Sequence, residues 1–170
     1  LGKVEAGNVP LAIGVANVVG YLAFGPLDRL FGSRKRPALA GTFATILMLA
    51  VLAALPALPL WIAIALLVGI GFASGAFVLV VAHGRAIAPD HLVGRAVTLF
   101  NIGTMGGAAL MQWLTGLIIG AVAGAGATAL PESAFRAMFA LLAASLTLAA
   151  IGYIRVPELQ TPAQEQPHAS

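Results

Sequence analysis

The chain has 170 residues, of which 60% are hydrophobic and only 9% carry a charge. A soluble domain carries about 25% charged residues, so this composition excludes an ordinary water-soluble globule and indicates a membrane protein. The net charge of +3 rests on few groups and gives no reason to expect a nucleic-acid partner. Cysteine is absent, which excludes disulfide frameworks, thiolate metal sites and cysteine nucleophiles.

Long uncharged segments dominate the sequence. A membrane-spanning helix needs about 20 mainly apolar residues to cross a hydrocarbon core of roughly 30 Å. Pro56 and Pro59 mark a tight turn inside the uncharged run over residues 37–84. A β-barrel would need a polar residue at every second position, and no such alternation is found. The sequence therefore predicts an all-α, polytopic membrane helix bundle of five transmembrane helices, at about residues 9–27, 37–55, 60–82, 97–123 and 134–154.

The Lys and Arg residues of the short loops favour one orientation. Seven of them lie between the first and second spans, between the third and fourth, or after the fifth, whereas Lys3 and Arg136 lie on the opposite side. This imbalance predicts an integral protein of the cell (inner or plasma) membrane with a cytoplasmic C-terminus. Residues 1–155 are expected to form the bundle. Residues 156–170 include three prolines and predict a disordered cytoplasmic tail.

A secretory signal is the weaker alternative for the first span, since only Lys3 supplies a basic leader and four more spans follow.

Glycines recur at four-residue spacing in two predicted spans. Small residues at this spacing let helices approach closely in lipid. One interpretation is that these helices slide or rock against their neighbours, and the other is static packing. The glycines concerned are Gly71 and Gly75 in the third span, and Gly103, Gly107, Gly116, Gly120 and Gly124 in or beside the fourth.

Polar residues are few inside the spans, and several of them share one face of the fourth span, where they follow the i, i+3, i+4 spacing of a helix. An unpaired amide in hydrocarbon costs several kcal/mol, so this face is expected to border a solute pathway or to form interhelical hydrogen bonds that only hold the bundle together. The candidates for the substrate pathway are Asn17, Ser74, Asn101, Thr104, Gln112 and Thr115.

No ionisable residue is expected deep inside a span, although proton-coupled carriers usually bury one. His83 and His91 are expected to flank a solvated loop. Two histidines eight positions apart with one carboxylate make a poor metal site. The sequence therefore predicts no catalytic residue, no metal and no cofactor, and the protein is not expected to be an enzyme.

The first basic loop reads Gly25-Pro26-Leu27-Asp28-Arg29-Leu30-Phe31-Gly32-Ser33-Arg34-Lys35-Arg36. It resembles the loop signature of the major facilitator superfamily, which has two glycines, an Asp-Arg pair and a basic cluster between two spans. The acid stands at the fourth position rather than the usual fifth, and Ser33 replaces a common basic residue. The segments Phe100-Asn101-Ile102-Gly103 and Phe135-Arg136-Ala137-Met138-Phe139 also look like this family.

The resemblance implies helices eight to twelve of a twelve-helix carrier, and so a longer natural protein whose N-terminal half is missing from this sequence. Such a chain would be part of a secondary active transporter that moves a small solute, with or without a coupling ion, by alternating access. The third span would line the central cavity, the first and fourth would flank it, and the second and fifth would be peripheral.

In this family the basic loop acts as a cytoplasmic latch whose acid and bases pair across helices. The resemblance assigns that role here to Gly25, Asp28, Arg29, Gly32 and Arg34.

The alternative to a transporter is a structural or assembly subunit that packs in the lipid bilayer without transport activity of its own. An intramembrane enzyme is the weakest hypothesis, because no acid, histidine or cysteine is expected within the spans to carry a proton.

Overall fold

The computed structural model describes residues 3–124 and 129–158. Within these ranges all regular structure is helical, and five stretches are long and apolar enough to cross a membrane. The predicted all-α bundle with five membrane helices is therefore confirmed. The helices are α1 (Lys3–Phe24), α2 (Leu27–Phe31), α3 (Lys35–Ala54), α4 (Leu60–Ala73), η1 (Ser74–Ala76), α5 (Phe77–Ile87), η2 (Asp90–Leu92), α6 (Val93–Ala123) and α7 (Glu132–Ile154).

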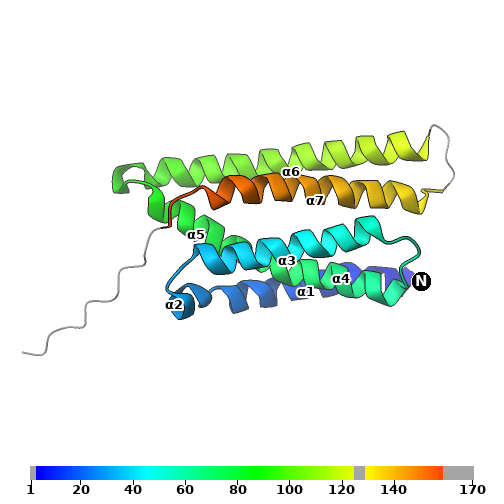
Figure 1. Ribbon diagram of the computed structural model, residues 1–170, viewed down its shortest axis with the longest axis horizontal. Helices are drawn as coiled ribbons and strands as arrows, with labels where there is room; N and C mark the ends of the chain where they lie inside the picture. Colours follow the sequence, from blue (N-terminus) through cyan, green and yellow to red (C-terminus); the bar gives the residue numbers. More distant parts are fainter. Residues whose placement is uncertain (1–2, 125–128, 159–170) are drawn as a thin grey trace, which may run out of the picture.

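The long helices lie roughly along one axis. Figure 1 shows α6 beside α7, and α1, α3 and α4 grouped below them, with α5 running obliquely from α4 to the start of α6. The most extensive contacts join α3 to α7 and α1 to α4. Of the predicted tail, residues 159–170 lie outside the described residues.

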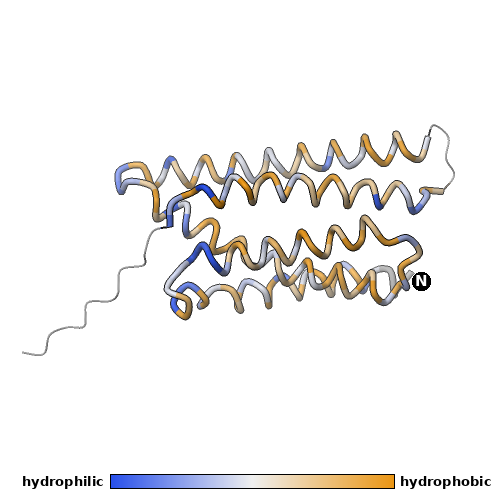
Figure 2. Tube along the Cα trace, in the orientation of Figure 1, coloured by the Kyte–Doolittle hydropathy of each residue, from blue (hydrophilic) through white to orange (hydrophobic). Residues whose placement is uncertain are grey.

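Hydrophilic residues gather at the two ends of the bundle, and the helices between these ends are mainly apolar (Figure 2). Most of the cations lie at the end that contains α2, the link from α5 to α6 and the last turn of α7. We call this the basic end; its cations are Arg29, Arg34, Lys35, Arg36, Arg85, Arg95 and Arg155.

The third predicted span is interrupted in the structure. A single 3₁₀ turn over Ser74–Ala76 separates α4 from α5, and α5 continues to Ile87, past the predicted end of the span at residue 82. The hydroxyl of Ser74 donates to the carbonyl of Gly71 at 2.6 Å. A serine that bonds back to the preceding turn bends a helix, and Gly75 next to it weakens the helix further.

The antiparallel helices α3 and α7 cap each other. Lys35, the first residue of α3, donates from Nζ to the carbonyls of Ile154 at 2.7 Å and Val156 at 2.6 Å, at the end of α7. Arg136, in the first turns of α7, donates to the carbonyls of the last two residues of α3 at 2.8 and 2.9 Å. Because a helix C-terminus carries partial negative charge, both cations stabilise this pair.

Glycines allow α1 to touch α4 and η1 almost backbone to backbone. A Cβ added at Gly71 would lie 2.7 Å from the carbonyl oxygen of Ile13. A Cβ added at Gly75 would collide with the backbone of Gly20. The close approach predicted from this glycine pair is confirmed, and its partner is α1.

The glycines of α6 have no such neighbour. None of the residues of α6 is buried, and a Cβ added at any of its glycines from Gly103 to Gly120 would meet nothing within 4 Å among the described residues. Large apolar side chains such as Met105 and Trp113 are also exposed on this helix. Within the described chain, the close approach expected for this second set of glycines is not found.

Candidate functional site

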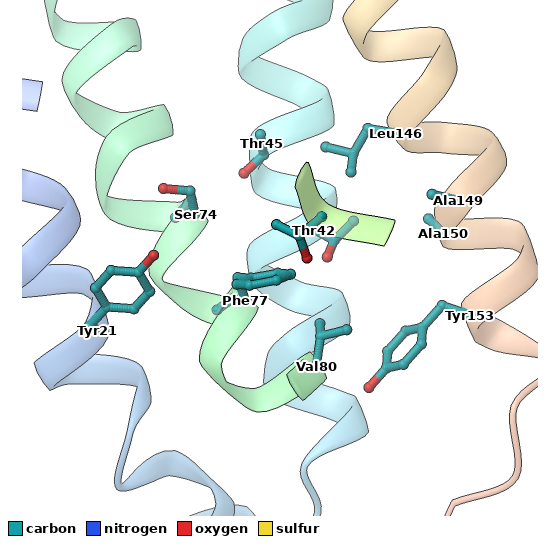
Figure 3. A pocket seen from close by; sticks show the side chains of 13 residues that line it. Tyr21, Thr42, Thr45, Ser74, Phe77, Val80, Leu146, Ala149, Ala150 and Tyr153 are labelled. Atoms are coloured by element: carbon teal, nitrogen blue, oxygen red, sulfur yellow. The ribbon is translucent and has the colours of Figure 1, made fainter. Parts of the chain in front are cut away.

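A cavity of about 660 Å³ lies inside the half of the bundle nearer the basic end. Figure 3 shows that residues of α1, α3, the η1–α5 segment and α7 surround it, and α6 contributes Thr104. The surface of the cavity wall is mainly apolar. The lining residues are Tyr21, Thr42, Thr45, Ala73, Ser74, Ala76, Phe77, Val80, Thr104, Leu146, Ala149, Ala150 and Tyr153.

Small residues contribute to the space that forms this cavity, since Ala73, Ala76, Ala149 and Ala150 all lie in its wall. Helices α3 and α7 thus supply much of the wall. These two helices, which the resemblance implies are peripheral to the central cavity of a whole carrier, thus line the cavity found within this chain. Short hydroxyl and alanine side chains form their part of the wall.

Two of the predicted pathway residues meet at the break in the third membrane helix. Asn17 on α1 donates from Nδ2 to Ser74 Oγ at 2.7 Å and to the carbonyl oxygen of Gly71 at 3.3 Å. Ser74 lies in the cavity wall, whereas Asn17 is not among the lining residues. The Asn17 amide therefore serves an interhelical hydrogen bond in this structure, as in the alternative interpretation of the polar residues.

The predicted polar face of α6 is brought to the cavity at only one position, Thr104. Its hydroxyl donates to the carbonyl of Phe100 at 2.7 Å, and that of Thr115 donates to the carbonyl of Gln112 at 3.0 Å. The side chains of Asn101 and Gln112 are exposed, and no hydrogen bond joins them to another described side chain. All four residues of the predicted face lie on α6, but only Thr104 lines the cavity.

The predicted latch residues form a compact loop. Arg34 Nε lies 3.4 Å from Asp28 Oδ2, so the acid pairs with a base six positions away in the same loop. Gly32 ends α2 with a left-handed φ of 59°, which glycine adopts at no steric cost. Gly25 closes the last turn of α1, and Arg29 is exposed. Within the described residues no ion pair joins this loop to another membrane helix.

His83 is buried, with 1% of its surface exposed. Its Nδ1 lies 2.8 Å from the hydroxyl oxygen of Tyr153, and its Nε2 lies 3.2 Å from the carbonyl oxygen of Pro157. The two rings meet edge to face, with centroids 5.6 Å apart. The expectation that His83 borders a solvated loop is wrong, because α5 continues through this residue. Its place inside the uncharged run over residues 37–84 was the signal in the sequence.

The lining residues can bind a solute through aromatic faces and hydroxyl groups. They include no carboxylate, imidazole or cation. In the part of the chain that the structure describes, no three His, Asp or Glu side chains lie close enough to hold a metal ion.

Comparison with known proteins agrees with this membrane architecture. The sequence matches the Major Facilitator Superfamily, a family of transporters, over residues 1–169. No curated protein matches, and no solved structure matches. The match takes in all five membrane helices, and together with their apolar composition it makes this an integral membrane protein with a transporter-type function. The chain belongs to the Major Facilitator Superfamily.

Proposed function

We propose that the chain is part of a secondary active transporter that moves a small solute across the cell membrane by alternating access. The observation that carries this proposal is the cavity of about 660 Å³ between membrane helices of a chain that belongs to a transporter family. A cavity of this volume falls in the range of small-molecule sites, which is roughly 300–1,000 Å³.

The chain would supply helices eight to twelve of a twelve-helix carrier. The open glycines of α6 and the exposed amides of Asn101 and Gln112 support this assignment, because close packing and polar contacts would make use of both features. The missing N-terminal half of the carrier would then face α6. A solute passing between the two halves would meet Asn101, Gln112 and Thr115 on one side of its path.

The other candidate residues take supporting roles in this proposal. Ser74 and Thr104 contribute to the cavity wall, and Asn17 fixes the position of Ser74. The basic end would face the cytoplasm together with the C-terminus, following the distribution of cations. There Asp28 and Arg34, with Gly25, Arg29 and Gly32, would form the latch that closes in one conformation.

Cysteine accessibility tests this function directly, because the chain contains no cysteine of its own. Thr42→Cys places a thiol in the cavity wall, and Leu47→Cys is the matched control, because this residue of the same helix is 66% exposed and lies outside the cavity wall. Each variant is made in the whole carrier, with any cysteine elsewhere replaced by serine. A charged, membrane-impermeant methanethiosulfonate is then applied to right-side-out and to inside-out vesicles.

Alternating access predicts that the thiol at position 42 reacts from both faces of the membrane, because one cavity opens to each side in turn. The thiol at position 47 should react from neither face, since the reactive thiolate does not form in lipid. Reaction at position 42 from one face only would contradict alternating access. Reaction from neither face would favour the packing subunit over the transporter.

A further inference from the structure

Most hydroxyl groups in the wall of the cavity already donate their proton in a hydrogen bond within the protein. Each threonine or serine hydroxyl carries one proton and two lone pairs. Four of these hydroxyls donate that proton to a carbonyl on their own helix, as hydroxyls in helices commonly do. The bonds run from Thr42 to Ala38 (2.9 Å), from Thr45 to Gly41 (2.9 Å), from Ser74 to Gly71 (2.6 Å) and from Thr104 to Phe100 (2.7 Å).

The hydroxyl of Tyr153 is committed in the same way, through His83. A carbonyl oxygen can only accept, so the contact of His83 Nε2 with the carbonyl of Pro157 at 3.2 Å places the proton of the neutral ring on Nε2. Nδ1 then carries the lone pair and accepts the Tyr153 hydroxyl proton at 2.8 Å. His83 thereby acts as a positioning residue that sets the direction of the Tyr153 hydroxyl.

Because of these bonds, the cavity wall offers a solute hydrogen-bond acceptors but few donors. Of the six hydroxyl-bearing residues in its wall, only Tyr21 has no acceptor among the described residues. Ser74 also accepts the Asn17 amide at 2.7 Å, so the hydroxyl oxygens of Thr42, Thr45, Thr104 and Tyr153 are the ones whose lone pairs remain for a solute. An anion requires donors or cations around it, and the lining residues supply almost none. A solute that carries its own N–H or O–H groups would find acceptors already in place.

The aromatic residues of the wall add to this preference. Tyr21, Phe77 and Tyr153 reach the cavity from α1, α5 and α7 (Figure 3). The face of an aromatic ring attracts an ammonium group, and the attraction is strongest when the cation is desolvated. Val80, Leu146 and the alanines suit an apolar body.

Building on the transport function proposed above, we propose that this cavity takes a largely apolar organic amine in its protonated form and rejects a carboxylate of the same size. The ammonium group brings three donors to the free lone pairs of the hydroxyls and to the aromatic faces. The carboxylate brings only hydrogen-bond acceptors, so its oxygens would face the hydroxyl oxygens of the wall without a proton between them.

Matched naphthalene probes test this polarity. Binding of 1-naphthylmethylamine and of 1-naphthoate to the whole carrier is measured by equilibrium dialysis in nanodiscs of phosphatidylcholine, a lipid without net charge. Empty nanodiscs supply the background from partition into lipid. We expect the amine to bind at least about tenfold more tightly than the carboxylate, a difference that a single well-placed charge-assisted hydrogen bond can produce.

Variants then locate this preference in the cavity. Thr42→Val together with Thr104→Val removes two acceptors at little change in shape and should weaken amine binding several-fold while leaving naphthoate binding unchanged. Thr147→Val is the control, because its hydroxyl donates to the carbonyl of Ala143 at 2.7 Å in the same way but lies outside the cavity wall. Ala149→Trp should block both probes by filling the space, whereas Leu148→Trp, at a residue 71% exposed, should block neither.

The outcomes separate the inference from the function that it rests on. If naphthoate binds more tightly than the amine, and Ala149→Trp still abolishes binding, the cavity is a solute site and the proposed polarity is overturned. If Ala149→Trp changes the binding of neither probe, the cavity is not the solute site, and both proposals fail.

Discussion

Two sets of glycines with the same spacing have opposite surroundings in this protein. Gly71 and Gly75 are buried against α1, so closely that a Cβ at either position would meet the backbone of that helix. Gly116 and Gly120 on α6 are exposed, and a Cβ at either would meet nothing within 4 Å among the described residues. The spacing of small residues therefore predicts that a helix can be approached closely, but it does not say which helix approaches it.

The two regions differ in their polar groups as well. At the α1–α4 contact the amide of Asn17 is paired with Ser74, whereas on α6 the amides of Asn101 and Gln112 are exposed. An amide in lipid needs a partner because the unpaired group costs several kcal/mol. The first region is thus a completed helix contact, whereas the glycines and amides of α6 have no such contact among the described residues.

The largest effect is expected from Gly75→Ala, which would force α1 away from η1. Overpacking of this kind costs about 1–3 kcal/mol, and backbone rather than a flexible side chain stands in the way here. The free energy of unfolding of the chain, measured by SDS titration in mixed micelles, should fall by that amount. Gly14→Ala on α1 is the control, since its Cβ would meet nothing within 4 Å. Equal stability of the two variants would contradict the packing described for α1 and η1.

Asn17→Ala is expected to have the next largest effect. It removes the hydrogen bonds to Ser74 and to the carbonyl of Gly71, and such interhelical bonds contribute about 0.6 kcal/mol on average and about 1.7 kcal/mol at most. The same unfolding measurement applied to Asn101→Ala should show no loss, because that amide is exposed on α6. A larger loss for Asn101→Ala than for Asn17→Ala would reverse the comparison of the two regions.

The α3–α7 pair offers a third kind of contact, one held at its ends by cations. Arg136→Gln weakens the interaction with the last two carbonyls of α3. Charges at helix C-termini contribute about 0.3–1 kcal/mol when exposed, so the loss of unfolding free energy should fall in that range. The loss should shrink in 1 M salt, because salt screens the interaction of a charge with a helix end. A loss that salt leaves unchanged would indicate packing of the arginine stem rather than charge.

Much of the fold follows from the sequence because hydrocarbon imposes a simple rule on the backbone. A chain in lipid must satisfy every backbone group within its own helices, so uncharged runs bounded by prolines and basic loops were enough to predict five membrane helices. The break at Ser74 was harder to predict, since it depends on a hydroxyl that bonds back to Gly71 and on a contact with α1 far away in the sequence.

The candidate site was predicted less well than the fold. Ser74 and Thr104 do line the cavity, but Thr42, Thr45 and Tyr153 were not predicted, because a threonine or tyrosine in an apolar span looks the same in sequence whether it faces lipid or a cavity. The sequence predicts a loop position for His83 because hydropathy alone ends the third span at residue 82, where polar residues begin. Helices extend past that point where a buried partner such as Tyr153 satisfies the side chain.

The smallest effect is expected from Gly116→Ala and Gly120→Ala on α6, and it is the most informative about that helix. With nothing within 4 Å of the added Cβ, each substitution should change the unfolding free energy of the 170-residue chain by less than about 0.5 kcal/mol, as surface substitutions usually do. In the whole carrier the same variants should cost about 1–3 kcal/mol if the other half packs on these glycines, because overpacking then applies.

The difference between the two measurements, rather than either alone, reports whether α6 has a partner outside this chain. A loss above 1 kcal/mol already in the chain by itself would mean that the glycines are covered there, by a second copy or by a conformation unlike the one described, and α6 would then no longer be the open counterpart of the α1–α4 contact.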